Sequence, residues 1–246
     1  MKKKGFTLEE RICRSACRPR QGARRNKAFT LAEVLITLVI IGVIGALTVP
    51  SLIQSTQKQE YVTALKKAYS TLSQATQQII AEEGSPKGDA GWADSIEHIY
   101  ELYKKHLNNA KECSGDIREC GILENYKTLG GWYDNNFRGR LSNNGKSLIL
   151  SDGIQLIFSF GNSECSISNN YDDSSQNVCS YIFADLNGAK KPNQFGRDVF
   201  GFAIKENGFF PLGCDNVISD ESACSTKAGH GFGCACKVLR EGAMNY

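Results

Sequence analysis

The feature that most constrains this chain is an uncharged apolar segment near its N-terminus. Residues 34–49 contain no charged side chain, and with Phe29, Leu31 and Ala32 in front they form about 21 mostly apolar residues. An α-helix of that length, at 1.5 Å per residue, crosses the roughly 30 Å hydrocarbon core of a membrane. A helix buried in a soluble core seldom runs this far without a polar face. The segment therefore predicts a single membrane span.

The charge around this segment predicts its orientation. Residues 1–28 hold 10 Lys/Arg and 2 Asp/Glu, whereas residues 29–246 hold 19 and 24, a net charge of −5. By the positive-inside rule, the basic tail stays cytoplasmic and the rest is exported. A secretory signal peptide would end at a small-residue cleavage site, but here the segment runs through Pro50 into a polar helix. Because the exported part is acidic, no nucleic-acid partner is expected.

Glu33 interrupts the apolar segment, and a carboxylate at bilayer depth costs at least about 2.5 kcal/mol, which marks it as a functional residue. It ends the sequence Ala28-Phe29-Thr30-Leu31-Ala32-Glu33. This sequence resembles the prepilin cleavage and methylation motif of type IV pilins and type II secretion pseudopilins, which usually reads Gly-Phe-Thr-Leu-Ile-Glu. Gly42 and Pro50 lie where many pilins also carry glycine and proline.

The resemblance implies that a prepilin peptidase cleaves between Ala28 and Phe29 and methylates the new amine of Phe29. It also implies that Glu33 accepts the amine of a neighbouring subunit in the filament, where the pair sets the axial register. Ala28 replaces the usual glycine, so slower processing is expected from a peptidase that binds extended backbone closely. A duplicate motif, Gly5-Phe6-Thr7-Leu8-Glu9-Glu10, lacks a following apolar segment, so we interpret it as a decoy or a mis-annotated upstream start.

Beyond Pro50, apolar residues recur every three or four positions, which predicts that the helix continues to about Glu83 with one packed face. Gly84 and Pro86 supply the stop. A second, shorter helix is predicted around Trp92 to Leu107. The residues of the packed face are Tyr61, Leu65, Ala68, Leu72, Ala75 and Ile79.

Strands and turns follow these helices. Two pairs of strands flank Asx-Gly turns at residues 151–153 and 206–208, which is typical of hairpins. The chain is 41% hydrophobic and 22% charged, close to the globular average, which excludes a disordered, collagen-like or polytopic membrane protein. We expect an α+β fold in which a long N-terminal helix, its apolar half protruding, packs on an antiparallel sheet of about four or five strands. The resemblance to pilins implies the same arrangement. The predicted strands are residues 146–150, 154–160, 180–186, 199–204 and 209–212.

Three parts of the chain follow from these predictions. Residues 1–28 are a basic leader, residues 29–50 form the half-helix of the membrane and filament core, and residues 51–246 form an extracytoplasmic head. The protein is expected first in the inner membrane, with a periplasmic head, and then in a pseudopilus or pilus.

Ten cysteines are many for this length, and Cys13 and Cys17 lie in the predicted leader. In an exported chain the other eight indicate disulfides. Short separations favour two pairs, and the last four would pair among themselves and staple the C-terminal loops. A zinc site of three of these last four cysteines with His230 is the alternative. The candidate disulfide residues are Cys113 with Cys120, Cys165 with Cys179, and Cys214, Cys224, Cys234 and Cys236.

A loop rich in oxygen donors follows the strand that ends near Leu186. Its side chains, in a Gly/Pro-rich context, are of the type that Ca²⁺ prefers. The loop resembles the calcium loop of major pseudopilins, which implies Asp185, Asn187 and Asp198 as ligands. The alternative is that Asx and Gly residues simply form turns, with Arg197 neutralising Asp198. No other cofactor is expected.

Catalytic motifs find little support. His98 and His106 are eight residues apart, not four as in H-E-x-x-H, and His230 lies between two glycines. The sequence therefore favours a non-enzymatic subunit of a type II secretion pseudopilus or a type IV pilus. Its partners would be prepilin peptidase, other pilin or pseudopilin subunits and the inner membrane. A minor pilin that binds surfaces or substrates is one alternative, and a membrane-anchored extracytoplasmic hydrolase is the other.

Overall fold

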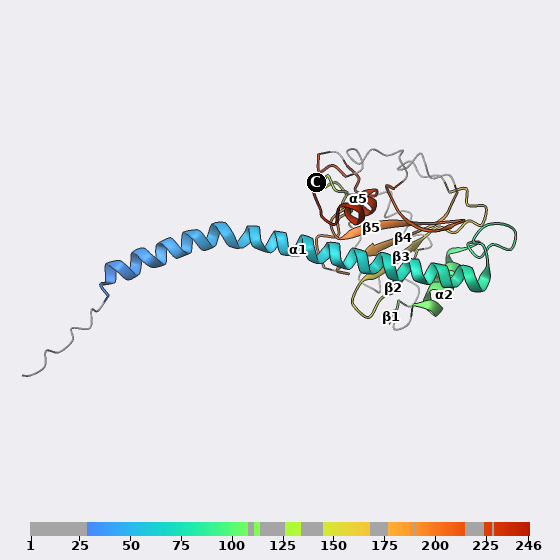
Figure 1. The fold of residues 1–246 in the computed structure, drawn as a ribbon, viewed down its shortest axis with the longest axis horizontal. Coiled ribbons are helices and arrows are strands. Elements are labelled where there is room, and N and C mark those ends of the chain that lie inside the picture. The colour runs from blue at the N-terminus through green and yellow to red at the C-terminus, as the bar shows by residue number, and fades with distance from the viewer. Residues whose placement is uncertain are drawn as a thin grey trace, which may run out of the picture. The chain divides into compact units, whose positions relative to one another are not determined.

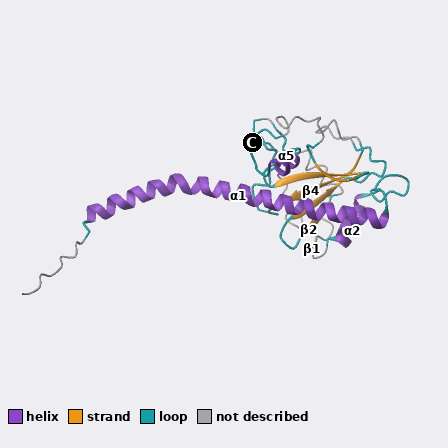
Figure 2. Cartoon of the chain, in the orientation of Figure 1, coloured by secondary structure: helices purple, strands orange, loops and turns teal. Residues whose placement is uncertain are grey.

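The structure is a computed structural model of the chain. It divides into two compact units, one ending at Ser51 and the other beginning at Leu52. Figure 2 distinguishes the helices, strands and loops of the described part of the chain. The described residues are 29–107, 111–113, 126–133, 145–167, 177–188, 190–214, 224–227 and 229–246.

One helix, α1 (Leu31–Glu83), runs from the first unit into the second. In the first unit every α1 side chain up to Ser51 is exposed, apart from a partly exposed Gly45. Among the described residues α1 is the one helix long and apolar enough to cross a membrane. This confirms the expected single long apolar helix.

In the second unit α1 changes character, because one face of it is buried. The predicted packed face is confirmed except at Tyr61, which is only half-buried. Gly84, with a φ of +87°, ends the helix, and its N–H donates to the Ile80 carbonyl at 3.0 Å. Glycine adopts this left-handed conformation without strain, which is why it terminates helices so often. The buried α1 residues are Val62, Leu65, Ala68, Leu72, Ala75, Thr76 and Ile79.

The second helix, α2 (Ile96–His106), begins after Ser95, whose hydroxyl accepts the His98 N–H. The hydroxyls of Tyr103 and of Thr76 on α1 are 2.5 Å apart, and both residues are buried. Because Thr76 Oγ1 already donates to the Leu72 carbonyl at 2.7 Å, Tyr103 is the donor in this contact. A buried polar bridge therefore ties α2 to α1.

The sheet is antiparallel and has six described strands in sequence order, one more than the upper expectation. Strand β1 has only two residues, too short for an alternating pattern to reveal it. A short helix, α5 (Cys234–Glu241), also escaped the sequence analysis. In Figure 1 the second half of α1 lies alongside the strands. The strands are β1 (Lys111–Glu112), β2 (Lys146–Ile149), β3 (Gln155–Ser159), β4 (Val178–Asp185), β5 (Val199–Lys205) and β6 (Gly208–Pro211).

Both faces of the sheet are covered, as the fully buried strands β3 and β4 require. Alternation sends Leu156 and Phe158 to the core shared with α1, α2 and α5. Ile157 points to a second, largely aromatic cluster. In that cluster the rings of Phe195 and Phe232 lie 4.3 Å apart. The second cluster packs the loop that precedes β5 against the sheet.

Candidate functional site

The N-terminus of α1 carries a reciprocal capping arrangement. Thr30 N and Thr30 Oγ1 both donate to Glu33 Oε2 at 2.8 Å, and the Glu33 N–H donates to Thr30 Oγ1 at 3.2 Å. This is a capping box, in which the first and fourth residues satisfy each other's backbone donors. The sequence signal for it is Thr-x-x-Glu directly before an apolar segment. The sequence analysis assigned Glu33 to a neighbour's amine and missed this local role.

Phe29 stands next to this cap and is 83% exposed. Ala28, the residue on the other side of the predicted cleavage point, lies outside the described residues, as do Cys13, Cys17 and the duplicate motif at residues 5–10. Phe29 therefore lies exposed immediately before α1 begins at Leu31.

A second polar arrangement lies where β4 ends and β5 begins. Asp185 and Asp198 are both fully buried. Tyr126 Oη donates to Asp185 Oδ2 at 3.3 Å, and the Asn187 N–H donates to Asp185 Oδ1 at 3.3 Å. The N–H groups of Asn193 and Gln194 donate to the two oxygens of Asp198 at 2.8 and 2.6 Å. Asp198 thus shapes the loop by binding its backbone.

The two carboxyls are electrostatically unfavourable together. Burial, and then the nearby Asp198, raise the pKa of Asp185 well above its usual range, and burial raises the pKa of Asp198. Arg197 is exposed, and no ion pair joins it to Asp198. The structure therefore does not support the alternative in which Arg197 neutralises Asp198. An ionised pair at this place costs free energy unless a cation compensates it.

Two amide oxygens beside these carboxyls lack donors. Asn187 Oδ1 and Asn193 Oδ1 are buried without a hydrogen-bond partner, while Asn187 Nδ2 donates to Tyr61 Oη at 3.0 Å. No three His, Cys, Asp or Glu residues of the described segments cluster as a metal site. The donor set is therefore two carboxyls and two amide oxygens, and an all-oxygen set of this kind suits Ca²⁺. Asn193 is the one of these four residues that the sequence analysis did not name as a ligand.

The cysteines of the described chain are joined in disulfides. Cys165 pairs with Cys179, Cys214 with Cys236, and Cys224 with Cys234. Cys113 is also disulfide-bonded, and Cys120 lies outside the described residues. The last four cysteines thus pair among themselves, and none of them is left as a thiolate for the alternative zinc site. Two of the bridges hold α5, because Cys234 and Cys236 are in its first turn.

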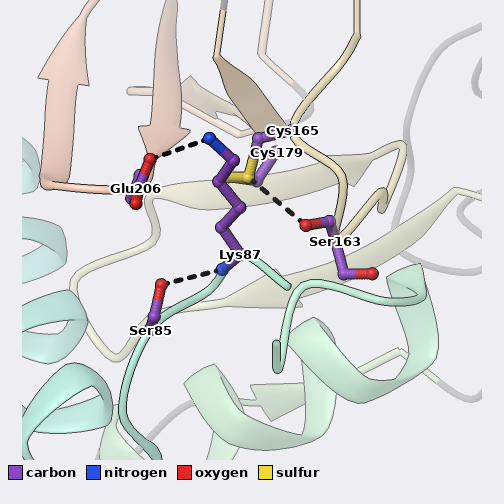
Figure 3. A network of polar contacts seen from close by, with 6 residues as sticks. All are labelled: Ser85, Lys87, Ser163, Cys165, Cys179 and Glu206. Atoms are coloured by element: carbon purple, nitrogen blue, oxygen red, sulfur yellow. Dashed lines mark hydrogen bonds and ion pairs between the residues drawn. A yellow bond between two sulfur atoms is a disulfide. The ribbon is translucent and has the colours of Figure 1, made fainter. Parts of the chain in front are cut away.

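Figure 3 shows the surroundings of the Cys165–Cys179 bridge. Lys87, just beyond the end of α1, reaches Glu206 in the β5–β6 turn, with Nζ 3.0 Å from Oε2. The Lys87 N–H donates to Ser85 Oγ at 3.1 Å. This end of the head is held by a disulfide and an ion pair.

The histidines lie apart from one another. His98 is exposed and contacts Asp94 at 3.0 Å, and the His106 side chain lies 3.5 Å from Glu82. The ring of His230 stacks with Phe232 at a centroid distance of 6.3 Å. None of these contacts aligns a nucleophile with a base, the arrangement that covalent catalysis uses.

No curated protein and no solved structure matches the chain significantly. The family described as prokaryotic N-terminal methylation motif matches residues 23–49. That segment contains Phe29, Thr30 and Glu33 and most of the exposed apolar part of α1. The chain therefore carries the N-terminal signature of type IV pilins and pseudopilins, whose members are structural subunits anchored by a single apolar helix.

Proposed function

We propose that this chain is a structural subunit of a type II secretion pseudopilus or a type IV pilus. It is cleaved between Ala28 and Phe29 by a prepilin peptidase, methylated at Phe29, and polymerised through α1. The observation that carries the proposal is the methylation motif at residues 23–49, which includes most of the exposed apolar part of α1. Catalysis has no part in this function.

The apolar part of α1 supports polymerisation. Its side chains between Leu31 and Ile53 include large aliphatic groups that are 42–77% exposed. An apolar surface of this size is stable in water only when something covers it. The membrane covers it before assembly, and the same segments of neighbouring subunits cover it afterwards.

Glu33 gives this assembly its register. Once cleavage frees the Phe29 amine, each subunit carries one positive charge and one carboxylate at the end of an apolar helix. The Thr30 capping box keeps the Glu33 carboxylate hydrogen-bonded in the single subunit. A neighbour's amine then pairs with a carboxylate that is already oriented, and the pairing neutralises both charges in the apolar core.

The first prediction concerns the mature N-terminus. Mass spectrometry of the protein from cells with an active prepilin peptidase should find N-methyl-Phe29 as the first residue. Cys13 and Cys17 should be absent from the mature chain. In cells without the peptidase the basic leader should remain. A mature start at Phe6, or after Pro50, would refute the proposed processing.

We also propose that the loop at Asp185 and Asp198 binds Ca²⁺. Asp185, Asp198, Asn187 and Asn193 would hold it through their side-chain oxygens. A bound divalent cation would neutralise the two buried carboxyls and satisfy both amide oxygens. The support is the pair of donor-free amide oxygens beside two carboxyls that repel each other.

The second prediction tests this calcium site in the full chain solubilised in detergent. At a Ca²⁺ concentration of 100 Kd the free energy of unfolding should rise by about 2.7 kcal/mol. For a domain of this size that raises Tm by about 5 to 10 °C. Asp198→Ala should abolish the difference between calcium and chelator, whereas Asp89→Ala, an exposed control, should keep it.

The calcium effect should also depend on pH. Because the pKa of both aspartates is raised in the folded state, their ionisation lowers the stability of the ion-free protein as the pH rises above about 4. Calcium binds the ionised forms, so its stabilising effect should be larger at pH 7 than at pH 5. Equal Tm values with calcium and with chelator at pH 7 would mean that hydrogen bonds alone hold the loop.

A further inference from the structure

A cavity of about 280 Å³ lies beside α1, within the second unit. Two of its lining residues, Lys58 and Arg197, are cations, and none of its lining residues carries an acidic side chain. Leu129 and Met244 provide buried apolar contacts. Other lining residues are Gln54, Gln57, Lys58, Tyr61, Arg197 and Tyr246.

The walls of this cavity are held by hydrogen bonds. Gln194 Nε2 donates to the carbonyls of Thr128 and Leu129, both at 3.0 Å. The Tyr246 hydroxyl donates to the Gly196 carbonyl. Lys58 Nζ donates to the Met244 carbonyl at 3.3 Å. The cavity is therefore formed before anything enters it.

The two cations of the cavity lack carboxylate partners. No ion pair joins Lys58 or Arg197 to any carboxylate of the described segments, although other lysines of the head are paired. Two positive charges beside a preformed cavity favour an anionic side chain as its occupant. The paired lysines are Lys67, Lys87, Lys104, Lys105, Lys146 and Lys237.

The same helix presents a carboxylate on its other side. At about 100° per residue, Glu60 lies about 200° around α1 from Lys58. Glu60 is exposed, lines a shallow groove with Thr63 and Lys67, and forms no ion pair with another described residue. One face of α1 thus offers cations in a cavity, and the opposite face offers an unpaired carboxylate.

The sequence places Lys58 and Glu60 at nearly the same position along the α1 helix axis. Between Glu33 and Glu60 the only charged residue is Lys58. Lys58 and Glu60 are therefore the first cation and the first anion after the apolar segment, and they are about 3 Å apart along the helix axis. When the α1 helices of two copies run parallel, the cavity of one copy and Glu60 of the other come within reach.

We infer that the Glu60 carboxylate of a second copy of this chain enters the cavity and pairs with Lys58 and Arg197. This inference rests on the proposed function, because it requires the parallel packing of α1 helices. Since the two contact surfaces lie on opposite faces of one helix, the contact is heterologous and repeats into an open filament. It also offsets part of the repulsion between copies whose residues 29–246 carry a net charge of −5.

The test uses reversed charges in the full chain, with two epitope tags in one cell. Glu60→Lys reverses the entering group, and the double variant Lys58→Glu/Arg197→Glu reverses the cavity. Each variant expressed alone places like charges together, so its incorporation into sedimented filaments should fall at least about tenfold. Expressed together, the two variants should co-assemble, because each cavity then meets an opposite charge.

Glu83→Lys is the matched control, since Glu83 is an exposed acid at the other end of the same helix and forms no ion pair with another described residue. This variant should assemble like the wild type. Normal assembly of Glu60→Lys alone, or no recovery in the mixture, would overturn the inference while wild-type filaments still support the proposed function. If the processed wild-type chain forms no filaments at all, the proposed function fails and this inference fails with it.

Discussion

Replacing Glu33 by glutamine is expected to lower incorporation of the subunit into filaments at least about a hundredfold, while cleavage and membrane insertion continue. Removing one partner of a buried ion pair costs roughly 3 to 5 kcal/mol, because the other charge stays buried and unpaired. At about 1.4 kcal/mol for each factor of ten, this corresponds to two or more orders of magnitude in association. The measurement is co-assembly of tagged wild-type and variant subunits, with crosslinking along the apolar part of α1.

The capping box makes glutamine the informative substitution. Both Glu and Gln serve as the fourth residue of such a box, so Glu33→Gln removes the charge and keeps the cap that Thr30 provides. Thr30→Ser, which also keeps the cap and leaves the charge, is the control and should assemble. In a protein that α1 only anchors in the membrane, neutralising Glu33 would ease membrane insertion and leave the activity of the protein unchanged. Equal incorporation of the Gln variant would therefore refute the assembly role.

The long helix could be predicted from the sequence because its signals are strong and local. The uncharged segment before Pro50, the three-and-four spacing after it and the stop at Gly84 each depend on residues close together in the chain. The hairpin turns at residues 151–153 and 206–208 are local in the same way. These features fix the α+β class and the number of long elements.

Other features depend on contacts between distant residues, and the sequence alone does not reveal them. Strand β1 is held by pairing with β2 and by the ion pair of Glu112 with Lys104 on α2. Helix α5 is held by the two disulfides that start in its first turn. The Asn193 N–H donates to Asp198 because the loop before β5 folds back on itself, and spacing in the sequence does not reveal that contact. The cavity beside α1 also needs Gln54 and Tyr246, which are far apart in the chain. The Thr30 capping box is different, because the local pattern Thr-x-x-Glu before an apolar segment predicts it.

Removing both disulfides of α5 should destabilise the head more than any single surface substitution. The Cys214–Cys236 and Cys224–Cys234 bridges close separations of 22 and 10 residues, and each such closure stabilises a fold by about 3 kcal/mol. Replacing all four cysteines by alanine should therefore cost up to about 6 kcal/mol, comparable with the whole stability of many domains. Replacing only Cys165 and Cys179, whose separation is 14 residues, should cost about half as much.

Thermal unfolding of the full chain in detergent measures this loss, which should lower Tm by about 12 to 24 °C for the fourfold variant. The effect should extend to assembly, because α5 leads directly to Met244 and Tyr246, which line the cavity beside α1. Without its bridges, α5 no longer fixes these two residues against Gly196 and Lys58. If the free energy of unfolding of the fourfold variant lies within about 1 kcal/mol of the wild-type value, packing of Val238 and Ala235 alone holds α5. The bridges are then not what positions the cavity wall.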